Sequence, residues 1–172
     1  IDPHPGCRCG TPMMRFSHPA ILFGLLLAFC PEAGHAAPTL AFPEASGFGA
    51  STPGGRGGKF VRVTTLDPKG PGSLKEALQT KGPRVIVFEV GGVIDLAGET
   101  LVAKEPFLTI AGQTAPSPGV TLIKGSFDVS THDVIIQHIR IRPGEAGHAK
   151  KSGWEADGIS TIGASNVIID HC

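Results

Sequence analysis

Two carboxylates stand two residues apart in the segment Glu155-Ala156-Asp157-Gly158-Ile159. Residues at this spacing on an extended chain point the same way, so both side chains can face one outer groove. Two converging carboxylates are unfavourable unless a cation balances them, and hard oxygen donors favour Ca²⁺, which takes about six to eight oxygens. We therefore predict that Glu155 and Asp157 form part of a calcium site. An acidic loop edge without an ion explains the spacing equally well. Ile159 shares their parity, so the backbone must bend near Gly158 if Ile159 points inward.

Histidines beside acids form a second group of candidates. Asp170 precedes His171, and an acid next to a histidine suggests general base catalysis. Adjacent residues on a strand point to opposite faces, however, so we expect that these two side chains do not act on each other. A hydrogen-bonded structural role is the favoured interpretation for Asp170 and His171. The same interpretation is given to His132 with Asp133, and to His138.

Two arginines alternate with isoleucines in the segment Ile139-Arg140-Ile141-Arg142. This alternation predicts a two-sided strand whose guanidinium groups point outward. Such groups suit contact with an anionic sugar chain, and salt bridges between stacked coils explain them at least as well. Nothing in the alternation decides between the two.

The composition limits the class of protein that can hold these residues. The chain has 172 residues, of which 41% are apolar and 17% charged, with 24 Gly and 15 Pro. It is too apolar for a disordered chain and too rich in turn-forming residues for a helical bundle. Its 15 Lys and Arg balance its 15 Asp and Glu, so no basic surface indicates nucleic-acid binding.

The first part of the chain reads as a targeting segment. Residues 1–12 carry no recognisable structure, and we interpret them as an upstream extension of the reading frame. Residues 13–36 read as a signal peptide, because the apolar run 20–29 is too short to span a bilayer and small residues precede a cleavage point after Ala36. We therefore expect a secreted protein, extracellular or periplasmic, without stable membrane association. Its mature domain would comprise residues 37–172.

Cleavage there changes the cysteine count. Cys7, Cys9 and Cys30 would be removed, which leaves Cys172 alone. A single thiol cannot form an internal disulfide, so the mature fold must depend on packing.

One short helix is well marked in the mature region. Ser73 and Glu76 have the spacing of a capping box, Leu74 and Leu78 give an apolar face, and Gly82 with Pro83 follows. A single amphipathic helix ahead of many strands suits the role of covering the open end of a stacked-strand solenoid. Before it, the glycine-rich run 54–58 leads into a strand-like segment and predicts a close-packed turn.

After Pro83 the sequence becomes a series of short apolar strands separated by turn residues, which predicts an all-β class. The strands are expected at Val85–Val90, Val93–Leu96, Phe107–Ile110, Val120–Ile123, Val134–Ile141, Gly158–Ile162 and Asn166–Asp170.

The spacing of these strands favours a parallel β-helix over a sandwich. Corresponding starts at Ile86, Leu108, Ile135 and Val167 lie 22, 27 and 32 residues apart, a recurring but irregular step that suits stacked coils. Uninterrupted apolar runs also suit strands covered on both sides, whereas a sandwich favours hairpin turns and polar outer faces. The longest step contains the polar segment Gly144–Glu155, which we expect to project as a loop.

Several segments resemble, in one order, the secreted pectate lyases of the pectate lyase superfamily. They are Gly47–Ala50, Gly54–Gly58, Gly70–Leu74, Leu108–Thr114 and Ile168–Cys172. The resemblance covers nearly all of residues 41–172 and implies a right-handed parallel β-helix, of which this chain is the N-terminal portion, ending before the C-terminal side of the solenoid. It also implies cleavage of polygalacturonate, an acidic polysaccharide, by β-elimination with Ca²⁺ as cofactor.

The resemblance assigns roles to few residues of this chain. Asp157 matches the first acidic calcium position of the family, and Glu155 falls where some members carry a second. The remaining acidic ligands and the catalytic arginine are expected beyond Cys172. No catalytic residue is therefore predicted within the chain, and the chain alone is expected to be inactive.

Two other functions remain open. Asp157-Gly158-Ile159 followed by Ser165-Asn166-Val167 faintly resembles polygalacturonase-like glycoside hydrolases, which would need a further cluster of aspartates. A non-catalytic β-helix that binds polysaccharide is the third reading. In each case we expect a monomer that does not bind nucleic acid.

Overall fold

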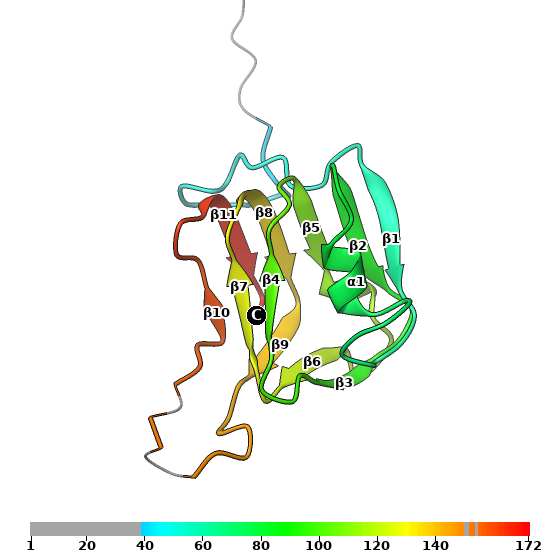
Figure 1. Cartoon of the computed structure of the whole chain (residues 1–172). Coiled ribbons are helices and arrows are strands. Elements are labelled where there is room, and N and C mark those ends of the chain that lie inside the picture. The colour runs from blue at the N-terminus through cyan, green and yellow to red at the C-terminus, as the bar shows by residue number, and fades with distance from the viewer. Residues whose placement is uncertain (1–38, 150–151, 154) are drawn as a thin grey trace, which may run out of the picture. The chain divides into compact units, whose positions relative to one another are not determined.

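The computed structural model describes residues 39–149, 152–153 and 155–172, and Figure 1 shows their arrangement. The predicted upstream extension (1–12) and signal peptide (13–36) lie outside these residues. Residues Ala37–Cys172 form one compact unit. Its elements are β1 Lys59–Val63, α1 Leu74–Leu78, β2 Arg84–Phe88, β3 Gly92–Asp95, β4 Thr100–Ala103, β5 Leu108–Ala111, the 3₁₀ turn η1 Gly112–Thr114, β6 Val120–Ile123, β7 Ser126–Val129, β8 His132–Gln137, β9 Ile139–Arg142, β10 Ile159–Ser160 and β11 Ser165–Asp170. No helix among the described residues is long and apolar enough to cross a membrane.

The strands build three parallel sheets. Sheet A has the order β1-β2-β5-β8-β11, sheet B the order β3-β6-β9, and sheet C the order β10-β7-β4. All strand pairs among the described residues are parallel. The chain passes from sheet A to B to C and back to A, so that each circuit lies on the one before. The unit is a parallel β-helix, as the sequence predicted, and the sandwich alternative was wrong.

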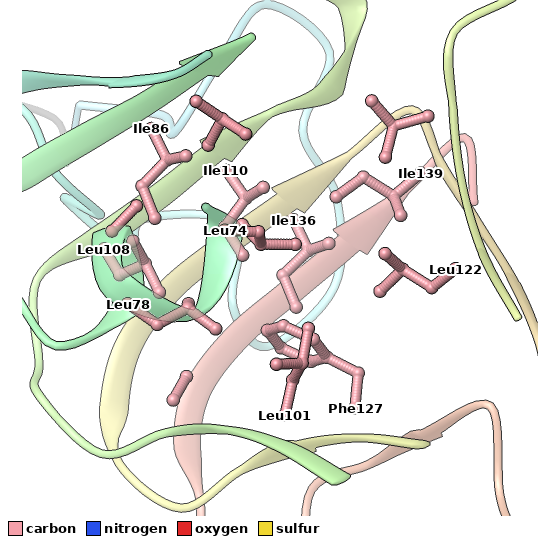
Figure 2. Close-up of a cluster of buried hydrophobic side chains, with 14 of the residues drawn as sticks. Leu74, Leu78, Ile86, Leu101, Leu108, Ile110, Leu122, Phe127, Ile136 and Ile139 are labelled. Atoms are coloured by element: carbon pink, nitrogen blue, oxygen red, sulfur yellow. The ribbon is translucent and has the colours of Figure 1, made fainter. Parts of the chain in front are cut away.

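The core is a column of apolar side chains enclosed by the three sheets. In β2 alternate residues point into it, and Arg84, Ile86 and Phe88 are buried. Figure 2 shows how aliphatic side chains from all three sheets meet there, with Phe127 as the one aromatic ring labelled. Burial of such side chains contributes roughly 1.5–3 kcal/mol each, so the coils are held together by this column.

The N-terminal end of the column is covered by α1, as predicted. Leu74, Ala77 and Leu78 are buried against the core, and the helix packs on β1 and β4 (Figure 1). The Ser73 hydroxyl accepts the backbone N–H of Glu76 at 3.2 Å. The Glu76 carboxylate accepts the backbone N–H of Gly72 at 2.6 Å. The predicted capping box therefore forms, but its second hydrogen bond comes from Gly72 instead of the N-cap residue Ser73.

A buried arginine joins this helix to the first complete coil. Arg84, which opens β2, is fully buried, and its guanidinium donates to the carbonyls of Leu78, Gly82, Glu105 and Pro106 at 3.0–3.2 Å. Burial lowers the pKa of this guanidinium. Its Nε has no hydrogen-bond partner among the described residues.

The glycine-rich run before β1 packs closely on sheet A, as predicted. A Cβ on Gly55 would lie 1.8 Å from the carbonyl oxygen of Arg84, and the Gly55 N–H donates to the Thr109 hydroxyl at 2.9 Å. Only glycine allows this approach between two backbones.

The strand boundaries required three corrections. The single strand expected at Val134–Ile141 is two strands, β8 in sheet A and β9 in sheet B, because the chain turns at His138 with φ +56°. Strands β4 and β7 were not predicted. The register also differs: Leu108 pairs with Arg84 and Val134, so the proposed correspondence with Ile86 and Ile135 was shifted by two residues and by one.

Candidate functional site

Glu155 and Asp157, the predicted calcium ligands, are both exposed and lie in the segment just before β10. This segment is not part of a strand, since β10 begins at Ile159. The parity of Ile159 therefore does not fix the direction of the two carboxylates, and the expected conflict does not arise. The coil re-enters the stack at Gly158, whose carbonyl accepts the N–H of Phe127 at 3.1 Å.

The two carboxylates fit Ca²⁺ only as contributors to a larger set. Oxygen donors on an exposed segment are the kind of ligand that Ca²⁺ takes, but two side chains fall short of six to eight oxygens. Among the described residues, neither is part of a group of three or more metal-ligating side chains. The arrangement is therefore compatible with an incomplete calcium site.

Arg140 and Arg142 lie on β9 and are exposed, as the alternation predicted, while Ile139 is buried. The Arg140 guanidinium donates to the carbonyl of Pro118 at 2.8 Å. No salt bridge from these guanidiniums was found within the described part of the chain. Both arginines are therefore placed where an anionic ligand can reach them.

At the N-terminal ends of β8 and β11, a polar cluster surrounds Asp133. Its carboxylate accepts from Asn166, from the Thr52 hydroxyl at 3.4 Å, and contacts His132 Nδ1 at 2.6 Å. Asp133 and Asn166 occupy successive coils with φ of +58° and +53°. His132 and Asp133 thus interact, because the left-handed residue breaks the alternation of the strand. Through Thr52, the cluster joins the segment before β1 to β8 and β11.

At the C-terminal ends of β8 and β11, the chain turns at a residue with left-handed backbone. His138 and His171 occupy this turn with φ of +56° and +53°. Their rings stack with centroids 4.8 Å apart and an angle of 19° between planes. The His138 N–H donates to the Asp170 carbonyl at 3.1 Å, which fixes the two turns on each other.

Asp170, the last residue of β11, completes this group. Its Oδ1 lies 2.8 Å from His171 Nδ1, and its Oδ2 accepts from Gln137 Nε2 at 2.9 Å. The expectation that Asp170 and His171 point to opposite faces was wrong, because β11 ends at Asp170 and His171 is not in strand conformation. The hydrogen bond from Gln137, then that from His171, lowers the pKa of Asp170.

The ligand atoms of His138, Asp170 and His171 all lie within 4.8 Å of one another. Sequence reasoning named these residues but did not bring them together. The available signal was the repeat of a polar residue followed by histidine, Gln137-His138 and Asp170-His171, at corresponding positions of two coils. The pair of histidines borders an open cleft of about 220 Å³ that Gln113 and Arg140 also line.

Curated proteins with similar sequences decide the relationship. The chain is 42% identical over 147 residues to a protein of Emericella nidulans named "Probable pectate lyase C", and 38% identical over 159 residues to one of the same name from Aspergillus fumigatus. These matches cover 85% and 92% of the chain. The chain is homologous to pectate lyases. A tomato (Solanum lycopersicum) protein named "Probable pectate lyase 18" is 30% identical in a match that covers 96% of the chain.

The chain spans less than half of the length of these relatives: 33% of the Emericella protein, 35% of the Aspergillus protein and 42% of the tomato protein. Among solved structures it is similar to jun a 1, the major allergen from cedar pollen, with 30% identity and a TM-score of 0.46 over 54% of this chain and 28% of the allergen. No protein-family model matches the chain.

Proposed function

We propose that this chain is part of a secreted, calcium-dependent pectate lyase that cleaves polygalacturonate by β-elimination. The observation that carries the proposal is the identity of about 40% with fungal proteins named pectate lyase, over most of the chain. The parallel β-helix supports it, because stacked coils form a long surface on which a polysaccharide can lie. We also propose that the protein acts as a monomer, without nucleic-acid or stable membrane partners.

The reaction breaks the bond between C4 of a galacturonate residue and the bridging oxygen. A base takes the C5 proton, the electron pair of that C–H bond forms the C4–C5 double bond, and the departing sugar leaves with the bridging oxygen, which then gains a proton. The C5 proton lies beside a carboxylate and is too weakly acidic to leave unaided. Bound Ca²⁺ supplies positive charge that offsets the negative charge developing next to C5.

The residues of this chain contribute binding. Asp157, and to a smaller extent Glu155, would hold the cation together with further oxygen ligands, because both are exposed carboxylates on the segment entering sheet C. Arg140 and Arg142 are exposed cations that suit the carboxylates of the substrate. We assign no arginine of this chain as the base, and we expect the catalytic arginine in the part of the relatives that this chain does not span.

The test compares the 172-residue chain with a protein extended through the region that the relatives carry. The extended protein should release unsaturated, ultraviolet-absorbing products from polygalacturonate, lose activity with a chelator and regain it with Ca²⁺. The 172-residue chain should release none. Saturated reducing ends would instead indicate a hydrolase, and polysaccharide binding without cleavage by the extended protein would indicate a binding module.

Substitution of Asp157 tests its proposed role directly. Asp157→Asn in the extended protein should raise the Ca²⁺ concentration needed for half-maximal activity by about tenfold or more, since one charged ligand is lost from a multidentate site. Glu155→Gln should have a smaller effect. Asp95→Asn is the matched control, because Asp95 is an acidic residue at the end of β3 that pairs with Lys124. This substitution should leave the Ca²⁺ concentration for half-maximal activity unchanged. An unchanged requirement in Asp157→Asn would remove this residue from the site.

A further inference from the structure

The two stacked histidines that follow β8 and β11 bring two imidazoles within reach of one metal ion, since their ligand atoms lie within 4.8 Å of each other. Because imidazole lone pairs lie in the ring plane, at least one exposed ring rotates out of the stack when both bind the same ion. His138 and His171 follow the last residues of β8 and β11, whose backbones pair in register through Gln137 and Asp170. Neighbouring strands lie about 4.8 Å apart, and the ring centroids are separated by the same 4.8 Å. Both imidazoles are exposed, so the edges of both rings can be reached from solvent.

Asp170 orients one of these rings. With Oδ1 of Asp170 2.8 Å from His171 Nδ1, the neutral imidazole carries its proton on Nδ1 and leaves the lone pair of Nε2 free. The carboxylate is itself held by Gln137, whose side-chain oxygen accepts from Gln113 at 3.3 Å. A carboxylate behind a histidine is the arrangement that commonly fixes metal-binding imidazoles in proteins.

The surroundings leave room for a cation with its water ligands. The histidines line an open cleft of about 220 Å³, large enough for several waters. Arg140 lines the same cleft and opposes a cation, but its guanidinium is hydrogen-bonded to the Pro118 carbonyl. Its repulsion acts through solvent and is reduced by salt.

We propose that His138 and His171 bind a divalent transition-metal ion of the zinc type, with Asp170 as the positioning residue for His171. Two imidazole nitrogens suit Zn²⁺, Ni²⁺ or Cu²⁺, whereas Ca²⁺ prefers oxygen ligands. The site uses no residue of the proposed calcium site, and the inference does not depend on the proposed function. Water molecules complete the coordination, so binding is weaker than at a structural zinc site with four protein ligands.

The experiment is isothermal titration calorimetry, in which the 172-residue chain is titrated with ZnCl₂ in calcium-free buffer at neutral pH. The variants are His138→Asn and His171→Asn, because asparagine tolerates the left-handed backbone of both turns and lacks the imidazole. The matched control is His132→Asn. His132 is also exposed and also contacts an aspartate through Nδ1, at 2.6 Å, but its ring packs edge-on against Phe107 instead of a second histidine.

Each of the two turn variants should lose one zinc site or weaken it at least tenfold, while His132→Asn binds as the wild type does. Thiols also bind zinc, so the histidine variants all keep the four cysteines of the chain. A separate Cys172→Ser variant should retain the histidine-dependent site. Equal zinc binding by the wild type and both turn variants overturns the proposal, as does loss of binding in Cys172→Ser alone. Circular dichroism establishes that each variant is folded.

Asp170→Asn separates positioning from a purely structural role. It should weaken zinc binding by about 10–100-fold. In ¹⁵N spectra of the imidazoles it should also change the tautomer balance of His171 and leave that of His138 unaffected. In the wild type, zinc should shift one ring nitrogen of both His138 and His171. Unchanged ring-nitrogen signals on zinc addition would show that these rings are not ligands.

Discussion

Two polar regions of the chain differ in how firmly the backbone holds them. The turns that follow β8 and β11 place His138 and His171 one above the other, because these two strands pair in register. The segment between β9 and β10 carries Glu155 and Asp157 outside any strand. The polar side chains of the first region are therefore preorganised by the backbone. In the second, the coil itself does not set the geometry of the side chains.

The difference shows where a β-helix gains precision. A residue at a tight turn inherits the spacing of its strand, so two such residues on neighbouring coils meet without further design. A residue in a long connection is freed from the register. Its position must be set by contacts within the connection, or by a ligand that several such residues share.

Gly112, His138 and His171 follow β5, β8 and β11 at corresponding positions, and we call these stacked residues the turn column. The largest expected effect comes from adding one carbon to it. A Cβ on Gly112, the residue below His138, would lie 2.5 Å from the carbonyl oxygens of Gln137 and His138. Gly112→Ala should therefore lower the free energy of unfolding by about 3 kcal/mol in urea denaturation. In the β9–β10 segment, Gly147→Ala meets no atom within 4 Å, and its φ of +86° costs about 1–2 kcal/mol. Equal losses in the two variants would break the comparison.

A pair of aspartates sharpens the comparison with a smaller effect. Asp133→Ala removes the acceptor shared by Thr52 and Asn166, and should lower the free energy of unfolding by about 2 kcal/mol. Asp157→Ala, measured without Ca²⁺, should change it by less than about 0.5 kcal/mol, as for most exposed positions. If Asp157→Ala proves as destabilising as Asp133→Ala, the carboxylate is fixed by its surroundings after all.

The smallest expected effect concerns a corner between sheets. Lys124 donates to Asp95 at 2.6 Å, and this bond, followed by the backbone N–H of Ala97, lowers the pKa of Asp95. A lowered pKa in the folded state stabilises the protein at pH values above about 4 and stops doing so as pH falls through the folded pKa. Asp95→Asn should lower the melting temperature slightly at pH 7, because exposed ion pairs contribute little.

At acid pH that difference should disappear. Melting curves of the wild type and Asp95→Asn collected between pH 2 and 7 test this. A gap that widens toward low pH would mean that Asp95 is not stabilised in its charged form. The Asp95 side chain would then not be held by Lys124 and Ala97, as the side chains of the β9–β10 segment are not held by the coil.

Much of the fold was predictable because its signals are local. Apolar runs located most strands, and Ser73 with Glu76 located the helix. Strands β4 and β7 were not predicted, although they have four residues like the predicted strands β3, β5 and β6. They are strands because Leu101 and Phe127 face the core and pair with each other on neighbouring coils, which no local window reveals.

The polar sites were less predictable for a related reason. Left-handed backbone is uncommon for any residue other than glycine, and although histidine adopts it more often than most, one histidine inside an apolar run does not mark a turn, so the strand was extended through His138. The same error placed Asp170 and His171 on opposite faces. The assignment of Glu155 and Asp157 to calcium stays a prediction, because it depends on ligands that two residues cannot supply.

Arg84 has a consequence for how the first coil comes apart. Its guanidinium donates hydrogen bonds to carbonyls at the end of α1, in the turn before β2 and in the segment just before β5. If any of these segments opens, the others lose a donor in the same event, and the charge is left without its full set of acceptors. The helix and the first coil should therefore exchange their amide hydrogens as one cooperative unit, so that the cap does not fray separately from the coil it covers.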